Sequence, residues 1–162
     1  MNDKLLDGQS FNQKYEGQTF IKLTNELENH NGYQFRTGLN IDTLPFNPKG
    51  ECQAGGIYFC LIEHVNLWLN YSNKPMIYVR LVTIPNDAQV WIETNQFKTD
   101  RVILGDRQII SDLDVWNDNL YCLAAVQQCS WALKYVKEQT PEICSAAVKN
   151  NGWAIHYVRR VT

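Results

Sequence analysis

The sequence lacks long hydrophobic runs, an excess of charge of one sign and a secretion signal. Its longest apolar stretches, such as MIYVRLVTIP at residues 76–85, are interrupted by charge and are too short to cross a bilayer. The 15 basic and 17 acidic residues nearly balance, so neither a nucleic-acid partner nor a membrane partner is indicated. The N-terminus has no basic start followed by an apolar stretch, which predicts a protein that is not secreted.

Motifs for catalysis and metal binding are also missing. There is no G-x-S-x-G, no H-E-x-x-H and no Walker phosphate loop. The five cysteines are an odd number without a paired framework, which favours reduced thiols. Cys52, Cys60 and His64 have the spacing C-x7-C-x3-H, which matches no tight zinc motif. We therefore expect no metal and no cofactor.

Two copies of one unit end the chain. YCLAAVQQCSWALKYVKEQT (121–140) and ICSAAVKNNGWAIHYVRRVT (143–162) are identical at nine of 20 aligned positions, with a period of 22 residues. Each unit has apolar residues at helical spacing and a central break, which predicts two short helices per unit. Thr140, Pro141 and Glu142 are typical of a helix start. Because helical repeats need about three units to bury a continuous core, these two are expected to pack on the preceding domain.

The rest of the chain predicts a mixed β-sheet with inserted helices. Residues 1–32 look partly helical, residues 61–72 have a helical apolar face, and residues 95–98 read as a polar connector. The predicted fold class is α+β, with an N-terminal domain at 1–115 and an all-α helical-repeat extension at 116–162. Strands are predicted at residues 33–38, 55–60, 76–85, 88–94 and 100–106.

Three features of the predicted sheet domain are candidates for contacts. Arg80 lies inside an apolar strand, so it needs a partner such as Asp87 or Glu93 or a solvent-facing position. Gly55 and Gly56 precede an aromatic strand, where they permit either a sharp turn or the close approach of a ligand to the backbone. Loop 40–54, rich in proline and glycine, is a candidate contact element.

Long segments of the chain resemble a viral family. FRTGLNIDTLPFNPKGECQAGGIYFC (35–60) and VTIPNDAQVWIETNQFKTDRVILGDR (82–107) resemble the N-terminal module of Mimivirus-type giant-virus repeat proteins. ALKYVKEQTPEICSAAVKNNGWAIHYV (132–158) resembles the short helical repeat of those viruses. The resemblance covers roughly residues 11–162 and implies a viral protein of the infected host's cytoplasm, the virus factory or the virion. It supplies no activity, and the repeat array here is unusually short.

A weaker resemblance is to the ADP-ribosyltransferase-like fold. FRTG and GGIYF are similar to two strands that contact NAD in that superfamily. The resemblance implies cofactor binding by Arg36, Gly38, Gly56 and Tyr58. Transferase chemistry needs a glutamate on a late strand, whereas FKTDRVIL at residues 97–104 has only Asp100, and Glu93 lies on the preceding strand. The implied catalytic residues are Arg36, Tyr58, Glu93 and Asp100.

Three functions therefore stay open. The leading interpretation is a non-enzymatic protein–protein interaction module for a host or viral protein. The alternatives are an NAD-binding domain of the ADP-ribosyltransferase type and a structural component of the virion. An enzyme is expected to show a cleft where Arg36, Tyr58 and a carboxylate converge, whereas an interaction module is expected to show an exposed apolar patch. The sequence leaves the oligomeric state open.

Overall fold

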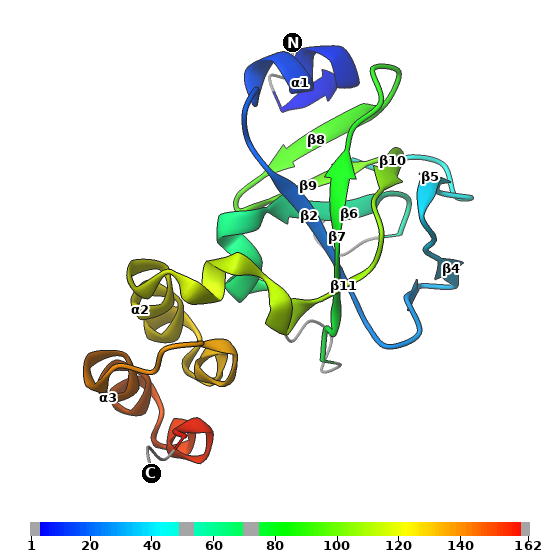
Figure 1. Cartoon of the computed structure of the whole chain (residues 1–162). Helices are drawn as coiled ribbons and strands as arrows, with labels where there is room; N and C mark the ends of the chain where they lie inside the picture. The colour runs from blue at the N-terminus through cyan, green and yellow to red at the C-terminus, as the bar shows by residue number, and fades with distance from the viewer. Residues whose placement is uncertain (1–3, 49–53, 70–74, 160–162) are drawn as a thin grey trace.

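An antiparallel β-sheet forms the head of the molecule, and helices extend from one side of it (Figure 1). The computed structural model describes residues 4–48, 54–69 and 75–159. The sheet has nine strands in the order β1-β8-β9-β6-β2-β7-β10-β5, with β11 also paired to β7, and β3 and β4 form a separate hairpin. The strands are β1 (Leu5–Asp7), β2 (Phe20–Thr24), β3 (Asn29–His30), β4 (Tyr33–Gln34), β5 (Gly38–Ile41), β6 (Ile57–Leu61), β7 (Tyr78–Thr83), β8 (Gln89–Glu93), β9 (Gln96–Thr99), β10 (Arg101–Leu104) and β11 (Gln108–Ile109).

The predicted mixed sheet is wrong, because every pairing between the described strands is antiparallel. Parallel neighbours need a long crossover connection, usually an α-helix. The segment expected to supply a helix contains only the short 3₁₀-helix η1 (Ile62–Leu67) within its described part. Strands β8 and β9 are instead joined by a two-residue connection, which favours the antiparallel pairing that they form.

The C-terminal part contains helices but is not the predicted all-α repeat. Each unit pairs one α-helix with one six-residue 3₁₀-helix. Cys129 and Val136, which both have extended backbone conformations, flank the 3₁₀-helix of the first unit. They limit the helix to six residues, and 3₁₀-helices typically occur in such short segments. The predicted start of the second unit is confirmed, since Thr140 caps the helix and Pro141 is its first residue. The helices are α1 (Gly8–Lys14), η1, η3 (Ile110–Asp112), η4 (Asp114–Asn117), α2 (Asn119–Gln128), η5 (Ser130–Tyr135), α3 (Pro141–Asn150) and η6 (Gly152–Tyr157).

Two strands inside the sheet order were missed by the sequence patterns. The segment expected to be helical around Phe20 and Ile21 is the central strand β2, which pairs with both β6 and β7. All five of its residues are buried, so it lacks the alternation of a half-exposed strand. The expected polar connector at residues 95–98 is mostly strand β9, whose Lys98 is fully buried.

Strand β2 separates two hydrophobic cores. Phe20 belongs to an aromatic core with Phe11 of α1, Phe59 and Phe97, whose ring centroids lie 5.1–5.8 Å apart. Ile21 and Leu23 point the other way, because side chains alternate along a strand.

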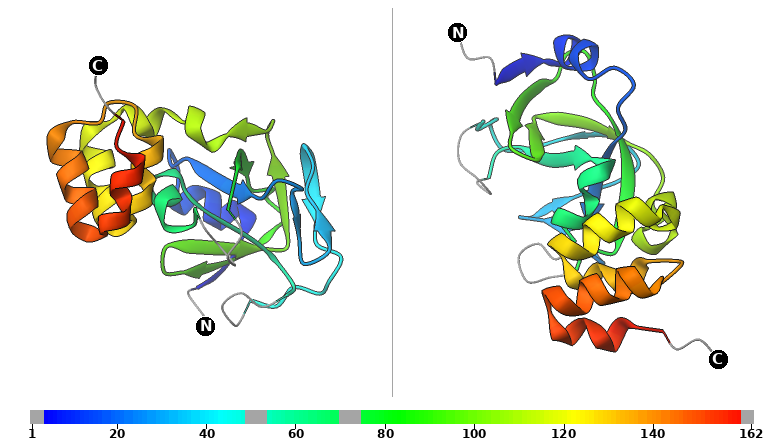
Figure 2. Two further views of the ribbon diagram at one scale, coloured as in Figure 1. Left: turned by 90° about the horizontal axis from the view of Figure 1, so that it is seen from below. Right: turned by 90° about the vertical axis from the view of Figure 1, so that its left-hand side faces the viewer.

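The second core joins the sheet to the C-terminal helices, and we call it the shared core. Its members from the sheet side include Ile21 and Val65, and its members from the helices include Trp116, Val126 and Leu133. These five side chains are fully buried. The repeats therefore bury apolar surface against the sheet (Figure 2). The domain boundary between residues 115 and 116 stays a prediction.

Candidate functional site

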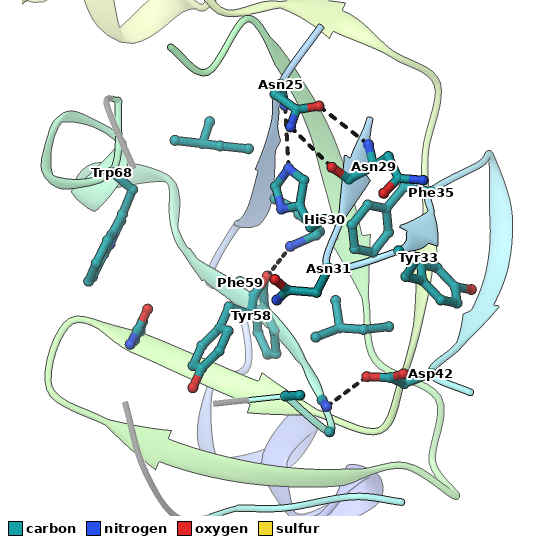
Figure 3. A pocket seen from close by; sticks show the side chains of 18 of the residues that line it. Asn25, Asn29, His30, Asn31, Tyr33, Phe35, Asp42, Tyr58, Phe59 and Trp68 are labelled. Carbon is teal, nitrogen blue, oxygen red and sulfur yellow. Dashed lines mark hydrogen bonds between the residues drawn. The ribbon is translucent and has the colours of Figure 1, made fainter. Parts of the chain in front are cut away.

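A cavity of about 330 Å³ lies between the β3–β4 hairpin and strand β6 (Figure 3). Its volume falls in the range of pockets that hold small ligands. Rings and amide side chains dominate its lining. The rings are those of His30, Tyr33, Phe35, Tyr58, Phe59 and Trp68, and the amides are those of Asn25, Asn29, Asn31 and Gln96.

The β3–β4 hairpin holds one wall of the cavity in place. Its turn is formed by Asn31 and Gly32, both with positive φ, which is the preferred sequence for a two-residue hairpin turn. The side chain of Asn25 exchanges hydrogen bonds with the backbone of Asn29, at 3.1 Å and 3.3 Å. The backbone N–H of Asn25 donates to Nε2 of His30 at 3.4 Å, so the imidazole is fixed above the cavity.

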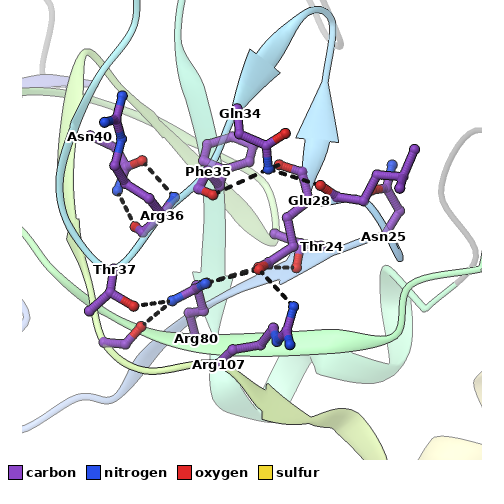
Figure 4. A network of polar contacts seen from close by, with 12 residues as sticks. Thr24, Asn25, Glu28, Gln34, Phe35, Arg36, Thr37, Asn40, Arg80 and Arg107 are labelled. Atoms are coloured by element: carbon purple, nitrogen blue, oxygen red, sulfur yellow. Dashed lines mark hydrogen bonds and ion pairs between the residues drawn. The ribbon is translucent and has the colours of Figure 1, made fainter.

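A buried ion pair anchors the same hairpin to the sheet (Figure 4). Arg80 on β7 donates to both carboxylate oxygens of Glu28, at 2.8 Å and 2.9 Å. It also donates to the Thr37 hydroxyl and the Gly105 carbonyl, and Thr24 donates to Glu28. The predicted partners Asp87 and Glu93 are therefore wrong, since the partner comes from the loop before β3.

Electrostatics keep this ion pair charged. Burial raises the pKa of Glu28, but hydrogen bonds from Arg80 and Thr24 and the charges of Arg80 and Arg107 outweigh it, so the pKa of Glu28 is lowered. The hydrogen bond to Glu28 raises the pKa of Arg80. Because both charges are buried and multiply hydrogen-bonded, the pair fixes the base of the hairpin.

Lys22 of β2 is a second buried charge, and it lines the cavity. Burial lowers the pKa of its amine to about 8. Its Nζ donates to the Tyr58 carbonyl at 2.7 Å and lies 4.6 Å from the centroid of the Phe35 ring. The amine thus links β2, β6 and the segment after β4 beneath the cavity floor.

The loop after β5 closes another side of the cavity. Asp42 accepts a hydrogen bond from the Gly56 backbone N–H at 2.7 Å and from the Leu44 backbone N–H at 3.0 Å. A Cβ on Gly55 would lie 2.5 Å from the Pro45 carbonyl oxygen, and one on Gly56 would lie 2.7 Å from Cε of Lys98. The two glycines therefore allow close packing of the protein's own loop and lysine.

Two of the residues predicted to bind NAD line the cavity, namely Gly56 and Tyr58. Arg36 is exposed and is not among the lining residues; its backbone N–H donates to Oδ1 of Asn40. Gly38 begins strand β5 with a φ of 96° and is also outside the lining.

The two predicted carboxylates also lie outside the cavity lining. Glu93 ends β8 and accepts a hydrogen bond from Gln96 at 2.6 Å. Asp100 lies in the β9–β10 turn, where it accepts from the Gln89 backbone N–H at 2.8 Å. Tyr58 and Asp42 therefore line the same cavity, whereas Arg36, Glu93 and Asp100 lie outside its lining.

Sequence reasoning missed Lys22, Asn25, His30 and Trp68 as cavity residues. A signal for the hairpin was present in TNELENHNG at residues 24–32. It is the dipeptide Asn31-Gly32, which is typical of a two-residue hairpin turn. Trp68 lines the same cavity as this hairpin only through tertiary packing, because it lies far from the hairpin in the sequence.

The cavity is suited to a flat group with hydrogen-bonding edges. The charged side chains of its wall, Lys22 and Asp42, already form hydrogen bonds with backbone groups of the protein. The rings provide stacking surfaces, and the asparagine amides provide both donors and acceptors.

Within the described ranges, no three His, Cys, Asp or Glu side chains are grouped to hold a metal ion, and Cys52 lies outside those ranges. No helix in the described part of the chain has the length and apolarity to cross a membrane.

Comparison with known proteins identifies viral relatives. No protein-family model matches the chain, and no solved structure matches it significantly. "Uncharacterized protein R869" of Acanthamoeba polyphaga mimivirus is 35% identical over 109 residues, which cover 64% of this chain and 76% of that protein. "Putative ankyrin repeat protein R868" of the same virus is 31% identical over 129 residues, 72% of this chain and 61% of that protein.

A further relative is much longer than the matched region. "Putative ankyrin repeat protein R229" of the same virus is 33% identical over 102 residues, which cover 57% of this chain but only 32% of that protein. The expected kinship with mimivirus proteins is thus confirmed. That the chain contains an N-terminal module placed ahead of repeats stays a prediction. This chain belongs to a family of mimivirus proteins that includes R869 and several proteins named for ankyrin repeats.

Proposed function

We propose that the chain is a non-enzymatic protein–protein interaction module of a giant virus, acting on a host or viral protein in the infected cell. The observation that carries the proposal is an exposed apolar patch on the head, which we call the β5 patch. It consists of Leu39 and Ile41 on β5, Leu81 on β7 and Ile103 on β10. Kinship with proteins named for ankyrin repeats supports an interaction role, because repeat proteins commonly present binding surfaces.

The geometry of three neighbouring strands makes the β5 patch continuous. Ile103 lies directly opposite Leu39 in the antiparallel register, so both side chains project from the same face. Leu81 lies beside Gly105, whose N–H donates to the Leu81 carbonyl. The four side chains are 39–53% exposed. Clustered apolar exposure of this kind marks interaction sites, whereas single exposed residues do not.

The position of β5 at the end of the described sheet order strengthens the proposal. An edge strand presents backbone donors and acceptors to a partner. Asn40 faces inward and is fully buried, where it bonds the Arg36 and Gly38 carbonyls, so β5 is rigidly held. Rigid apolar side chains on an edge strand lose little entropy on binding.

Site-specific photo-crosslinking in infected host cells tests this proposal. A photoreactive amino acid replaces Ile41 in the patch, and a control chain carries it at Leu27, which is exposed but does not belong to the patch. We expect discrete protein adducts from position 41 that are absent from position 27 and are lost when Ile103→Asp is added. Identical adducts from both positions, or none from position 41, would contradict the proposal.

A second candidate is NAD binding in the cavity, favoured because Gly56 and Tyr58 line it together with stacking rings and amides. Since Glu93 and Asp100 lie outside the lining, this candidate is binding without transfer. The test is thermal unfolding with and without millimolar NAD. An increase in melting temperature that Tyr58→Leu removes and Tyr157→Leu retains would favour it, and no increase would reject it.

A further inference from the structure

One charged side chain of the cavity has no counter-ion among the described residues. Lys22 lines the cavity and is only 5% exposed. Its amine donates one hydrogen bond, to the Tyr58 carbonyl, and lies 4.6 Å from the centroid of the Phe35 ring. A carbonyl and a ring face supply only partial negative charge. Because lysine is almost never buried without a paired charge, this ammonium lacks the partner that its burial requires.

The opposite residue on the neighbouring strand shows how a buried cation on this face is satisfied. Arg80 of β7 lies directly across from Lys22 in the antiparallel register, so the two cations project from the same face. Arg80 has a carboxylate partner, that of Glu28, which Arg107 also approaches at 3.7 Å. Glu28 is the only carboxylate among the buried residues that the structure describes. The face therefore carries more positive than negative charge, and the excess is at Lys22.

Other groups of the cavity lining do not neutralise the Lys22 amine. Asp42 accepts hydrogen bonds from two backbone N–H groups and forms no ion pair within the described residues. The Cys60 thiol stays protonated near neutral pH, because burial raises its pKa to about 12. The remaining titratable side chains of the lining carry no negative charge at neutral pH, namely His30, Tyr33 and Tyr58. The missing charge is therefore left for a ligand to supply.

The amine borders the space that a ligand would occupy. In Figure 3 its hydrogen bond to the Tyr58 carbonyl lies between the His30 and Tyr58 side chains. An ammonium has three N–H donors, and this hydrogen bond uses one of them. The rings of Tyr58, Trp68 and Phe35 stand around the same space and offer stacking surfaces. A buried positive charge and flat apolar surfaces thus meet at one cavity.

We propose that the cavity binds a small planar molecule with one carboxylate, which supplies the counter-ion that Lys22 lacks. A carboxylate is flat, so it can accept a hydrogen bond from the amine while the rest of the ligand lies between the rings. One negative charge balances one ammonium, whereas a phosphate dianion would bring a second charge into a buried site without a partner. A cationic ligand would be repelled by Lys22 itself. The proposal depends neither on the β5 patch nor on NAD binding.

Binding of 2-naphthoate to the full chain tests the proposal, with 2-naphthamide as its neutral isostere and 2-naphthylmethylammonium as a cation of similar size. Each probe is titrated calorimetrically at pH 7, up to about 1 mM. We expect naphthoate to bind at least about tenfold more tightly than the other two probes, because a hydrogen bond between charged groups is stronger than one with a neutral partner. Lys22→Met should remove this preference, whereas Lys14→Met, at an exposed position on α1, should retain it.

Proton uptake identifies Lys22 as the group that meets the carboxylate, and its measurement needs no variant. Burial lowers the pKa of the Lys22 amine to about 8, and a bound anion raises it again. At pH 8.5 the free amine is mostly neutral and the bound amine is charged, so binding should take up about half a proton or more per ligand. At pH 7 the amine is mostly charged in both states, so this uptake should largely disappear. Titrations in two buffers with different ionisation enthalpies give the number of protons.

Four results of these titrations would overturn the proposal. The first three are equal binding of naphthoate and naphthamide, tighter binding of the cation, and no binding of naphthoate at about 1 mM. The fourth is a preference for naphthoate that Lys22→Met retains. If Lys22→Met fails to fold by circular dichroism, the proton uptake of the wild type decides, and an uptake near zero at pH 8.5 rejects the proposal.

Discussion

At the scale of single residues, glycine is required where the backbone adopts positive φ and where a neighbour occupies the space of a side chain. Gly55 meets both conditions, with a φ of 93° and the Pro45 carbonyl oxygen 2.5 Å from an ideal Cβ. Gly17 meets only the first, since its φ is 83° and nothing lies within 4 Å. The two positions therefore separate backbone strain from steric overlap.

We expect Gly17→Ala to lower the free energy of unfolding by about 1–2 kcal/mol, through left-handed strain alone. Gly55→Ala should cost more, because the Pro45 loop must also move away from the cavity. Urea unfolding of both variants measures the difference. Equal losses would show that the loop next to the cavity is not held as tightly as the contact distance indicates.

Lys22 makes stability depend on pH. Burial lowers the pKa of its amine from 10.5 to about 8, so between these values the unfolded chain binds more protons than the folded one. Stability contributed by this group therefore rises with pH across that window and falls as pH drops through 8. Relative to Lys22→Met, the wild-type free energy of unfolding should rise by about 1 kcal/mol from pH 8 to pH 9.

Urea titrations of both chains between pH 7.5 and 9 check this difference. The window stops at 9 because burial raises the pKa of the neighbouring Cys60 thiol to about 12, which lowers stability at higher pH. Parallel pH curves for wild type and Lys22→Met would mean that the amine is not desolvated beneath the cavity.

At the scale of elements, the β3–β4 hairpin depends on an ion pair that spans 52 residues of sequence. Arg80→Met leaves the Glu28 carboxylate buried without its main partner, which we expect to cost about 3–5 kcal/mol. The double variant Glu28→Leu/Arg80→Met should recover much of that loss, because no unpaired charge remains buried. Chemical denaturation provides the measurement.

A surface ion pair is the matched control for that experiment. Arg101 bonds Asp87, which is mostly exposed, at 3.0 Å and lies 3.5 Å from the Asp100 carboxylate. Arg101→Met should therefore cost less than about 1 kcal/mol. A loss as large as that of Arg80→Met would show that burial does not distinguish the two pairs.

Several elements could be predicted from local patterns. Strands β6, β7, β8 and β10 were expected near their observed positions, because β-branched and aromatic residues dominate them. Strand β2 was missed because both its faces are buried, which removes alternation. Strand β9 was missed because Lys98 reads as polar, although Gly56 leaves room for its alkyl chain and the Tyr58 ring lies 5.2 Å from its amine.

At the scale of the whole molecule, the shared core makes the head and the repeats depend on each other. Removal of residues 116–162 would expose Val65 and Ile21, which are now fully buried. We expect the fragment 1–115 to lose cooperative unfolding and to bind a hydrophobic dye, whereas the full chain unfolds in one transition. Circular dichroism and dye fluorescence measure this. A fragment with the same melting temperature as the full chain would show that the head is independent.

The sequence by itself determined the repeated unit, the start of its second copy and strands β6, β7, β8 and β10 of the head, because these depend on residues close together in the chain. Its long motifs also identified the viral family. Only the tertiary structure decided that the sheet is antiparallel, that Arg80 pairs with Glu28, and that Lys22, His30 and Trp68 meet at one cavity. These features join residues tens of positions apart, and their partners are selected by packing and by the need to satisfy buried charge.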